Sequence, residues 1–244
     1  MGALKLVAVS AGLSKPSSTR LLADRLAEAT ARELAAADRK AEAEVVELRE
    51  LAVDIANNLV TGFPSAALSA ALDRVTGADG LIVVTPVFAA SYSGLFKSFF
   101  DLVEPDALAG TPVLLAATGG TARHSLVVEH ALRPLFTYLH ALTLPTAVFA
   151  ATDDWGAGAD TYAGGLPARI ERAGGEFARL LGAVAPVRGG AAGADGAGEA
   201  GEARELDGAG ERGELGGAGE RGGAGELDDL DDVVPFEQLL GKLT

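Results

Sequence analysis

The sequence predicts a doubly wound α/β fold built on a mostly parallel sheet of five strands. Strand-like apolar segments and helix-like amphipathic segments alternate over about 180 residues, an order typical of such sheets. The segment 80–86 is apolar and β-branched at its centre, as expected of a strand covered on both faces. Loops of small polar residues follow three of the strands, and this fold class binds ligands at the carboxyl ends of its strands.

The first predicted strand, residues 6–9, leads into the most informative loop. Apolar positions after the loop recur at helical spacing, and Ser17 or Ser18 suits the N-cap of a helix that ends near Asp38. A hydroxyl-rich loop at a helix start can hold an anion, because unpaired N–H groups and the helix dipole favour negative charge. An ordinary serine-capped turn explains this loop as well. The loop has neither the Gly-x-Gly-x-x-Gly pattern nor a P-loop ending.

The middle of the chain predicts two further strands. Residues 43–48 predict a partly exposed strand at a sheet edge, and residues 51–64 predict an irregular segment because Asn, Gly and Pro interrupt them. Residues 65–75 have helical spacing. After the 80–86 strand and its polar loop, residues 95–103 predict a helix with a strongly apolar face, capped by Ser91 or Ser93, whose phenylalanines belong to the core or to a subunit contact.

The last third of the predicted domain adds two strands and two helices. Residues 111–117 predict a strand that runs into a Thr-Gly-Gly-Thr loop. Residues 125–140 predict a helix that is interrupted near a proline. Residues 142–151 predict the fifth strand, although a proline weakens its first half. Residues 167–184 predict a final amphipathic helix.

The C-terminal quarter has a different composition. Residues 185–232 are rich in Gly, Ala and Glu and contribute −9 of the net charge of −14. This composition predicts a disordered, flexible acidic linker. Residues 233–244 are apolar again and are expected to dock on their own domain or on a neighbouring subunit. We therefore expect a folded domain at 1–184, and the acidic balance argues against nucleic acid as a partner.

Composition excludes several classes of site. The absence of Cys removes disulfides, thiolate zinc sites and cysteine nucleophiles, and three histidines make a histidine-rich metal site improbable. His124, His130 and His140 are expected to be surface or packing residues. Trp155 is equally compatible with an exposed loop position and with covering a ligand in a neighbouring subunit. No signal peptide or membrane-length apolar run is evident, so we expect a cytoplasmic protein without membrane contact.

Two motifs resemble the NAD(P)H-dependent FMN reductases of the flavodoxin-like superfamily. These are residues 10–20, SAGLSKPSSTR, and residues 85–101, TPVFAASYSGLFKSFFD. The Thr-Gly-Gly-Thr loop followed by His124 resembles the third flavin loop of that family. The likeness covers about residues 4–184. It is closest to the branch that supplies reduced FMN to two-component monooxygenases, and the ending VPFEQLL at 234–240 is also similar to that branch.

The resemblance implies a complete set of flavin contacts. It places the FMN phosphate on Ser10, Ser17, Ser18 and Thr19, the ring against Pro86, Val87, Phe88 and Ala89, and the pyrimidine end on Thr118, Gly119 and Gly120. It also implies FMN and NADPH or NADH as cofactors, small-molecule substrates, a homodimer or homotetramer, and a flavin-dependent monooxygenase as partner. No catalytic side chain and no metal are expected, because hydride transfer to a flavin needs no protein nucleophile.

Three other functions stay open on the sequence. The first is a quinone, azo-dye or chromate reductase with bound FMN. The second is a flavodoxin-like electron carrier, although carriers usually surround the flavin with acidic and aromatic residues and the loop here reads Val-Phe-Ala-Ala-Ser. The third is a flavin-independent nucleotide-binding or structural protein. Nothing in the sequence separates NADH from NADPH.

Overall fold

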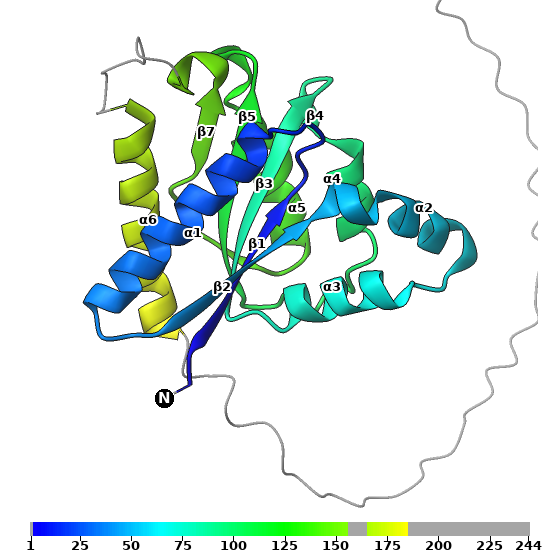
Figure 1. Ribbon diagram of the computed structural model, residues 1–244, viewed down its shortest axis with the longest axis horizontal. Helices are drawn as coiled ribbons and strands as arrows, with labels where there is room; N and C mark the ends of the chain where they lie inside the picture. Colours follow the sequence, from blue (N-terminus) through cyan, green and yellow to red (C-terminus); the bar gives the residue numbers. More distant parts are fainter. Residues whose placement is uncertain (1, 156–164, 185–244) are drawn as a thin grey trace, which may run out of the picture. The chain divides into compact units, whose positions relative to one another are not determined.

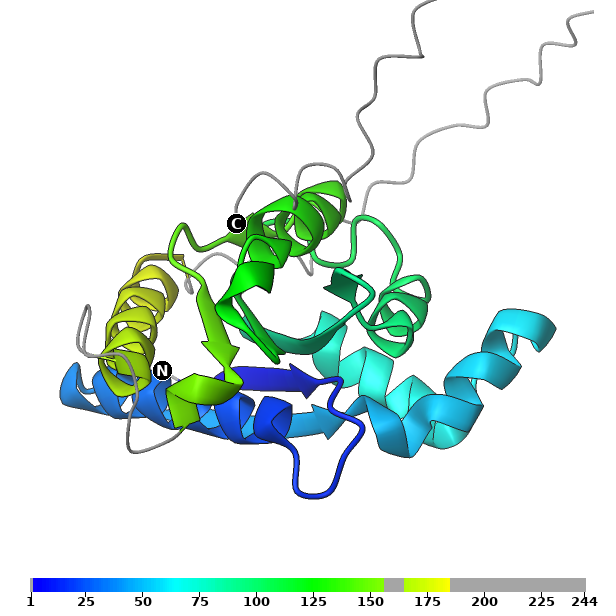
Figure 2. The same ribbon diagram turned by 90° about the horizontal axis from the view of Figure 1, so that it is seen from above.

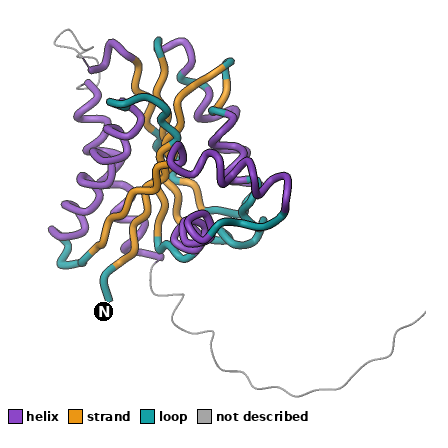
Figure 3. The backbone as a smooth tube through the Cα atoms, turned by 45° about the vertical axis from the view of Figure 1, so that its right-hand side comes forward, coloured by secondary structure: helices purple, strands orange, loops and turns teal. Residues whose placement is uncertain are grey.

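A central sheet organises the computed structural model, which describes residues 2–155 and 165–184 (Figure 1). The predicted linker, 185–232, and the apolar segment, 233–244, lie outside the described residues. The sheet has seven strands, which Figure 3 shows between two layers of helices. The strands are β1 (Leu4–Ser10), β2 (Ala41–Glu47), β3 (Gly80–Phe88), β4 (Ser91–Tyr92), β5 (Pro112–Gly119), β6 (Leu142–Thr143) and β7 (Val148–Ala151).

The strand order is that of the flavodoxin-like fold. The sheet runs β2-β1-β3-β5-β6, and all pairs are parallel except the short β3–β4 hairpin. Both β6 and β7 pair with β5, one after the other, so together they occupy one strand position. Pro145, which cannot donate to a ladder, lies between them. Five parallel positions in the order 2-1-3-4-5 result, and β2 lies at an edge as predicted.

Helices cover both faces of the sheet (Figure 2). Helices α1 and α6 pack on one face, while α3, α4 and α5 pack on the other. The helices are α1 (Ser18–Ala36), α2 (Ala52–Thr61), α3 (Ala66–Thr76), α4 (Gly94–Phe100), α5 (Arg133–Tyr138) and α6 (Gly165–Val184). Shorter turns are η1 (Leu48–Leu51), η2 (Ala122–His124), η3 (Val128–Leu132) and η4 (Thr152–Trp155).

Side-chain alternation along β1 builds two separate cores. Leu6 and Ala8 join the cluster under α1 and α6, whereas Val7 and Val9 join the cluster under the other helices. The second cluster contains an aromatic stack in which Phe100 lies 4.7 Å from Phe96 and 4.9 Å from Phe136, centroid to centroid. Phe96, Phe99 and Phe100 are therefore core residues, one of the two roles predicted for them.

The prediction of an irregular segment at 51–64 is wrong. Helix α2 occupies most of it and ends at Gly62, whose φ of 77° stops the helix. Ile55 is the buried residue of this helix, while Val53 and Val60 are 73% and 87% exposed. Because the exposed face is also apolar, the sequence lacks the alternation of polar and apolar residues that identifies a helix.

The predicted helix at 125–140 forms in two pieces. The wide π-helical turn η3 comes first, and α5 follows it. Pro134 stands at the start of α5 and has no N–H to continue an α-helical ladder from the preceding turn. Helix α1 ends at Ala36, two residues before the predicted end, and Asp38 beyond it has a positive φ of 55°.

Candidate functional site

Three loops meet at the carboxyl edge of the sheet, where β1, β3 and β5 end side by side (Figure 1). The backbone N–H of Ala11 donates to the carbonyl of Val84, 3.0 Å away, which ties the first loop to β3. The hydroxyls of Thr19 and Thr118 lie 2.8 Å apart in a buried hydrogen bond, which ties α1 to the end of β5. The predicted convergence of the loops is confirmed.

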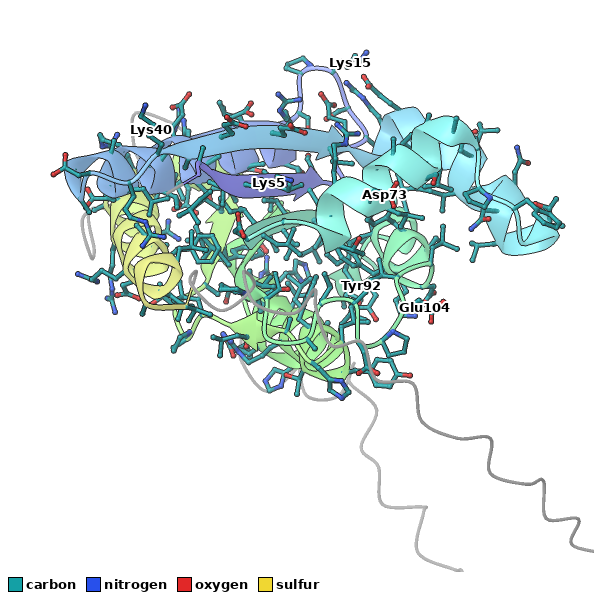
Figure 4. All side chains as sticks on the ribbon, turned by 90° about the horizontal axis from the view of Figure 1, so that it is seen from below. Lys5, Lys15, Lys40, Asp73, Tyr92 and Glu104 are labelled. Atoms are coloured by element: carbon teal, nitrogen blue, oxygen red, sulfur yellow. The ribbon has the colours of Figure 1, made fainter. Side chains whose placement is uncertain are left out.

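The first loop, residues 11–17, closes tightly on itself. Ser17 is the N-cap of α1, and its Oγ accepts from the backbone N–H of Arg20 at 3.2 Å. A Cβ on Gly12 would stand 2.0 Å from that Oγ, so any other residue there would displace the Ser17 hydroxyl. Lys15 stands at the projecting turn of the loop (Figure 4). The loop thus places the start of α1, with its unpaired N–H groups, at the sheet edge.

The predicted phosphate residues differ in exposure. Ser10 and Thr19 are buried, Ser17 is half-buried and Ser18 is exposed. The Thr19 hydroxyl already has Thr118 as its partner. Ser17 and Ser18 are therefore the two predicted phosphate residues with surface open to a ligand, and Thr19 holds two loops together.

The second loop is a hairpin between β3 and β4. Thr85 Oγ1 accepts from the backbone N–H of Ser93 at 3.0 Å, and Ser93 caps α4 by accepting from the N–H of Phe96 at 3.2 Å. Ser93 is thus the residue that realises the predicted cap. At the tip, Ala89 and Ala90 have positive φ values of 46° and 63°. Of the predicted ring contacts, Pro86 and Val87 are half-buried, and Phe88 and Ala89 are exposed.

The third loop, residues 118–121, contains a close approach and an unused hydroxyl. A Cβ on Gly119 would lie 2.8 Å from the Phe149 ring, so no other residue fits without displacing that ring. Gly120 is exposed. The Thr121 Oγ1 atom is buried and has no hydrogen-bond partner among the described residues. A buried hydroxyl without a partner is costly, and a bound polar ligand would satisfy it.

The three loops carry no acidic residue. Residues 10–20, 85–95 and 118–125 contain no Asp or Glu, although the chain has 34 of them, and they include Lys15, Arg20 and Arg123. The hydrogen bond from Arg20 to Asp24 raises the pKa of Arg20, helped by Asp24 and Glu47 as neighbouring charges. Arg20 is thus already paired with two carboxylates, whereas Lys15 and Arg123 have no ion pair in the described chain. The three loops themselves therefore suit an anion despite the acidic chain.

The residues present fit an FMN molecule. Serine hydroxyls and the start of a 19-residue helix offer donors for a phosphate, two tightly packed loops contain glycine, and none of the three loops carries a carboxylate. Among the described residues, no group of three His, Asp or Glu side chains is arranged to hold a metal. What the edge can do is bind, orient and electrostatically stabilise a flat anionic ligand.

A cavity at the other end of the sheet contains none of the predicted site residues. It measures about 230 Å³ and is lined by residues near the start of β1 and the end of α3, among them Lys5, Asp73 and Arg74. Figure 4 labels Lys5 and Asp73 on these elements. Ligands of this fold class bind at the opposite, carboxyl edge, so we do not assign the cavity to the site.

Two features of the edge were not predicted from the sequence. Arg49, in η1, donates to the carbonyl of Ser14 at 2.9 Å and pairs with Glu47. The parallel register sets Glu47 beside Ser10, but no sequence motif signals this pairing. Trp155 lies half-buried rather than exposed, with the guanidinium of Arg25 5.2 Å from its ring centroid. Its other predicted role, covering a ligand in a neighbouring subunit, stays a prediction.

Most of the chain is similar in sequence to known proteins. Residues 4–156 match the family model described as NADPH-dependent FMN reductase. An FMN reductase (NADPH) from Pseudomonas aeruginosa is 42% identical over 181 residues, which are 73% of this chain and 92% of that protein. An NADH-dependent FMN reductase, SfnE, from Pseudomonas putida is 45% identical over 147 residues, 60% of this chain and 76% of that one.

A solved structure supports the fold. An oxidoreductase from Corynebacterium diphtheriae superposes with a TM-score of 0.70 at 44% identity and covers 74% of this chain and 98% of its own. Within the described residues, no helix combines the length and the apolar character that crossing a membrane requires. The match to the family model thus spans β1 to β7 and includes the three loops of the carboxyl edge.

Proposed function

Since this chain belongs to the NADPH-dependent FMN reductase family, we propose that its carboxyl-edge loops bind FMN and that it reduces FMN with NADPH or NADH. One observation supports this site above the others: hydrogen bonds join three loops that together carry no carboxylate. Such an edge suits a ligand with a phosphate and with a ring that becomes negative on reduction.

The first loop would hold the phosphate. Ser17 and Ser18 offer hydroxyls beside the first-turn N–H groups of α1, which favour an anion. Ser10, at the end of β1, would complete the floor of this pocket. Thr19 would contribute through its backbone and through the bond that fixes Thr118.

The second and third loops would hold the ring. Pro86, Val87, Phe88 and Ala89 would form one wall, and the backbone of Thr118, Gly119 and Gly120 would face the pyrimidine end. Bound FMN supplies the hydride acceptor. The chain's own contribution is to orient the two ligands, to exclude water with the apolar wall, and to stabilise negative charge with backbone N–H donors.

Oxidation of reduced nicotinamide by the purified protein tests this function. We expect NADPH or NADH to be consumed with FMN present and not with buffer alone, and the two rates give the nucleotide preference. A protein that retains FMN through gel filtration and oxidises neither nucleotide would be an electron carrier. Faster turnover with a quinone, azo dye or chromate than with FMN would identify the alternative reductase.

We also propose a flavin-dependent monooxygenase as the consumer of the product. The branch that the motifs resemble supplies reduced FMN to such enzymes, and the product of the proposed reaction is reduced FMN. This role requires that FMN leave the protein. We therefore expect gel filtration to remove FMN from the protein, and retention of stoichiometric FMN would contradict the role.

We propose that the protein forms a homodimer or a larger homo-oligomer through the surface of α2 and α3. The α2–α3 surface comprises Val53, Val60 and Phe63, which are 73%, 87% and 82% exposed, with their neighbours. Residues 55–72 contain no charged side chain. Charge depletion with exposed apolar and aromatic residues is typical of interface cores. A patch without charged side chains avoids local repulsion between two copies that each carry −14.

A further inference from the structure

The tip of the first loop is held from outside by one side chain. Arg49 reaches across from η1, and its guanidinium donates to the Ser14 carbonyl at 2.9 Å. Within the part of the chain that the structure describes, no other hydrogen bond or ion pair reaches residues 12–16. These residues include the exposed turn with Lys15, so the Arg49 contact is the restraint on the tip.

Arg49 is itself fixed by a chain of ion pairs. Its second guanidinium nitrogen lies 2.9 Å from Glu47, and both side chains are only 17% exposed. The other carboxylate oxygen of Glu47 accepts from Arg20 in the first turn of α1, and Arg20 also pairs with Asp24 at 2.9 Å. Glu47 therefore connects the two arginines that flank the loop.

We propose that Arg49 is a positioning residue for FMN: by holding the Ser14 carbonyl it fixes the 11–17 loop in the conformation that receives the phosphate. With its Ser14 carbonyl held by Arg49, the tip has fewer conformations open to it before binding. A loop ordered before binding loses less conformational entropy when the phosphate arrives, which strengthens affinity. This inference rests on the proposed function.

The geometry distinguishes this role from direct contact with the phosphate. The two terminal guanidinium nitrogens of Arg49 are engaged by Ser14 and Glu47, and the Glu47 carboxylate offsets the Arg49 charge. A guanidinium fork can span these two acceptors, whereas a lysine ammonium is a single point of contact. Arg49→Lys should therefore behave like Arg49→Met if the role is positioning, and should keep affinity if the role is charge.

The first test compares FMN with riboflavin, which lacks the phosphate. We expect Arg49→Met and Arg49→Lys each to weaken FMN binding roughly tenfold, the cost of ordering about one more backbone residue on binding, and to leave riboflavin binding unchanged. Arg74→Met is the matched control, because Arg74 lies on α3 in a long 3.7 Å pair with Glu44. Equal weakening of both flavins, or full FMN affinity in Arg49→Lys, would overturn the proposal.

A second readout needs no flavin. Amide hydrogen exchange of the peptide 11–19 should be faster in Arg49→Met than in the wild type or Arg74→Met, while exchange of the core strands stays the same. Unchanged exchange in that peptide would overturn the positioning role. If the native protein binds no FMN but the exchange difference appears, the proposed function fails and the structural part of this inference stands.

Discussion

The close packing of the first loop around Gly12 can be tested by adding a single methyl group at that residue. A Cβ there would meet Ser17 Oγ at 2.0 Å and Thr19 Cβ at 3.0 Å. Gly12→Ala must displace the Ser17 hydroxyl from the Arg20 N–H, so we expect a loss of about 1 kcal/mol in the free energy of unfolding and weaker FMN binding. Urea unfolding and an FMN titration measure the two effects.

Gly175→Ala is the matched control for Gly12→Ala. A Cβ on Gly175 would meet its nearest atom, in the Glu33 side chain, at an ordinary 3.8 Å. We expect this variant to be as stable as the wild type or more so, because alanine is favoured over glycine within a helix. Gly12→Ala with unchanged stability and unchanged FMN affinity would disprove the close approach of Gly12 and Ser17.

The buried bond between Thr19 and Thr118 predicts a characteristic pair of results. Thr19→Val leaves the Thr118 hydroxyl buried without its partner, which should lower the free energy of unfolding by about 1–3 kcal/mol. The double variant Thr19→Val with Thr118→Val removes both polar groups and should lose less than the two single variants together. Additive losses in urea unfolding would mean that the two hydroxyls do not bond.

At the scale of elements, the link between η3 and α5 predicts a pH dependence. Glu129 accepts from Arg133 at 2.6 Å, and this hydrogen bond lowers the pKa of Glu129 below its ordinary 4.5. The folded state thus releases this proton more readily than the unfolded state. The stabilisation is complete above pH 4.5 and disappears as the pH falls through the lower folded-state value.

Glu129→Gln tests this dependence. Because the Glu129 side chain is 47% exposed, we expect roughly 0.5 kcal/mol or less at neutral pH. The difference between wild type and variant, followed by urea unfolding at a series of pH values, should shrink on acidification. Glu28→Gln is the control, since Glu28 is exposed and pairs with no basic group of the described chain. A difference that grows toward acid would contradict the lowered pKa.

Sequence patterns predicted the elements whose environment is simple. The strand at β3 is buried on both faces and reads as a continuous apolar run, and α1 is read from its cap and its spacing. Helix α2 was missed because Val53 and Val60 are apolar yet exposed. Its sequence therefore lacks the polar outer face by which a surface helix is recognised. The interruption between β6 and β7 follows from Pro145, which the sequence did indicate.

Site residues were predictable to the extent that they lie in loops after strands. Parallel strands imply that the loops after them meet at one edge of the sheet. They do not imply which residues of different loops form hydrogen bonds there. Arg49 and Ser14 are 35 positions apart, and only the register of β1 with β2 brings them together. The hydrogen bond between Thr19 and Thr118 spans 99 positions, so no local sequence pattern could predict it either.

At the scale of the whole molecule, the α2–α3 surface predicts the oligomeric state. Val60→Lys places a charge where the side chain is 87% exposed, so the monomer's stability should change little. The same charge would be buried in a dimer interface, so we expect dissociation, measured by sedimentation velocity. Glu28→Lys on the exposed side of α1, where Glu28 has no ion pair in the described chain, is a control that should leave assembly unchanged. An unchanged oligomer in Val60→Lys would place the interface elsewhere.

The central claim is that FMN is reduced with its phosphate held at the start of α1. The most direct measurement is the rate of NADPH and NADH oxidation against flavin concentration, with FMN and with riboflavin, for the wild type and Ser17→Ala. We predict flavin-dependent oxidation in which Ser17→Ala raises the KM for FMN and leaves the KM for riboflavin unchanged. An oxidation rate that does not depend on added flavin would contradict the account. So would an equal change in the KM for FMN and for riboflavin in Ser17→Ala.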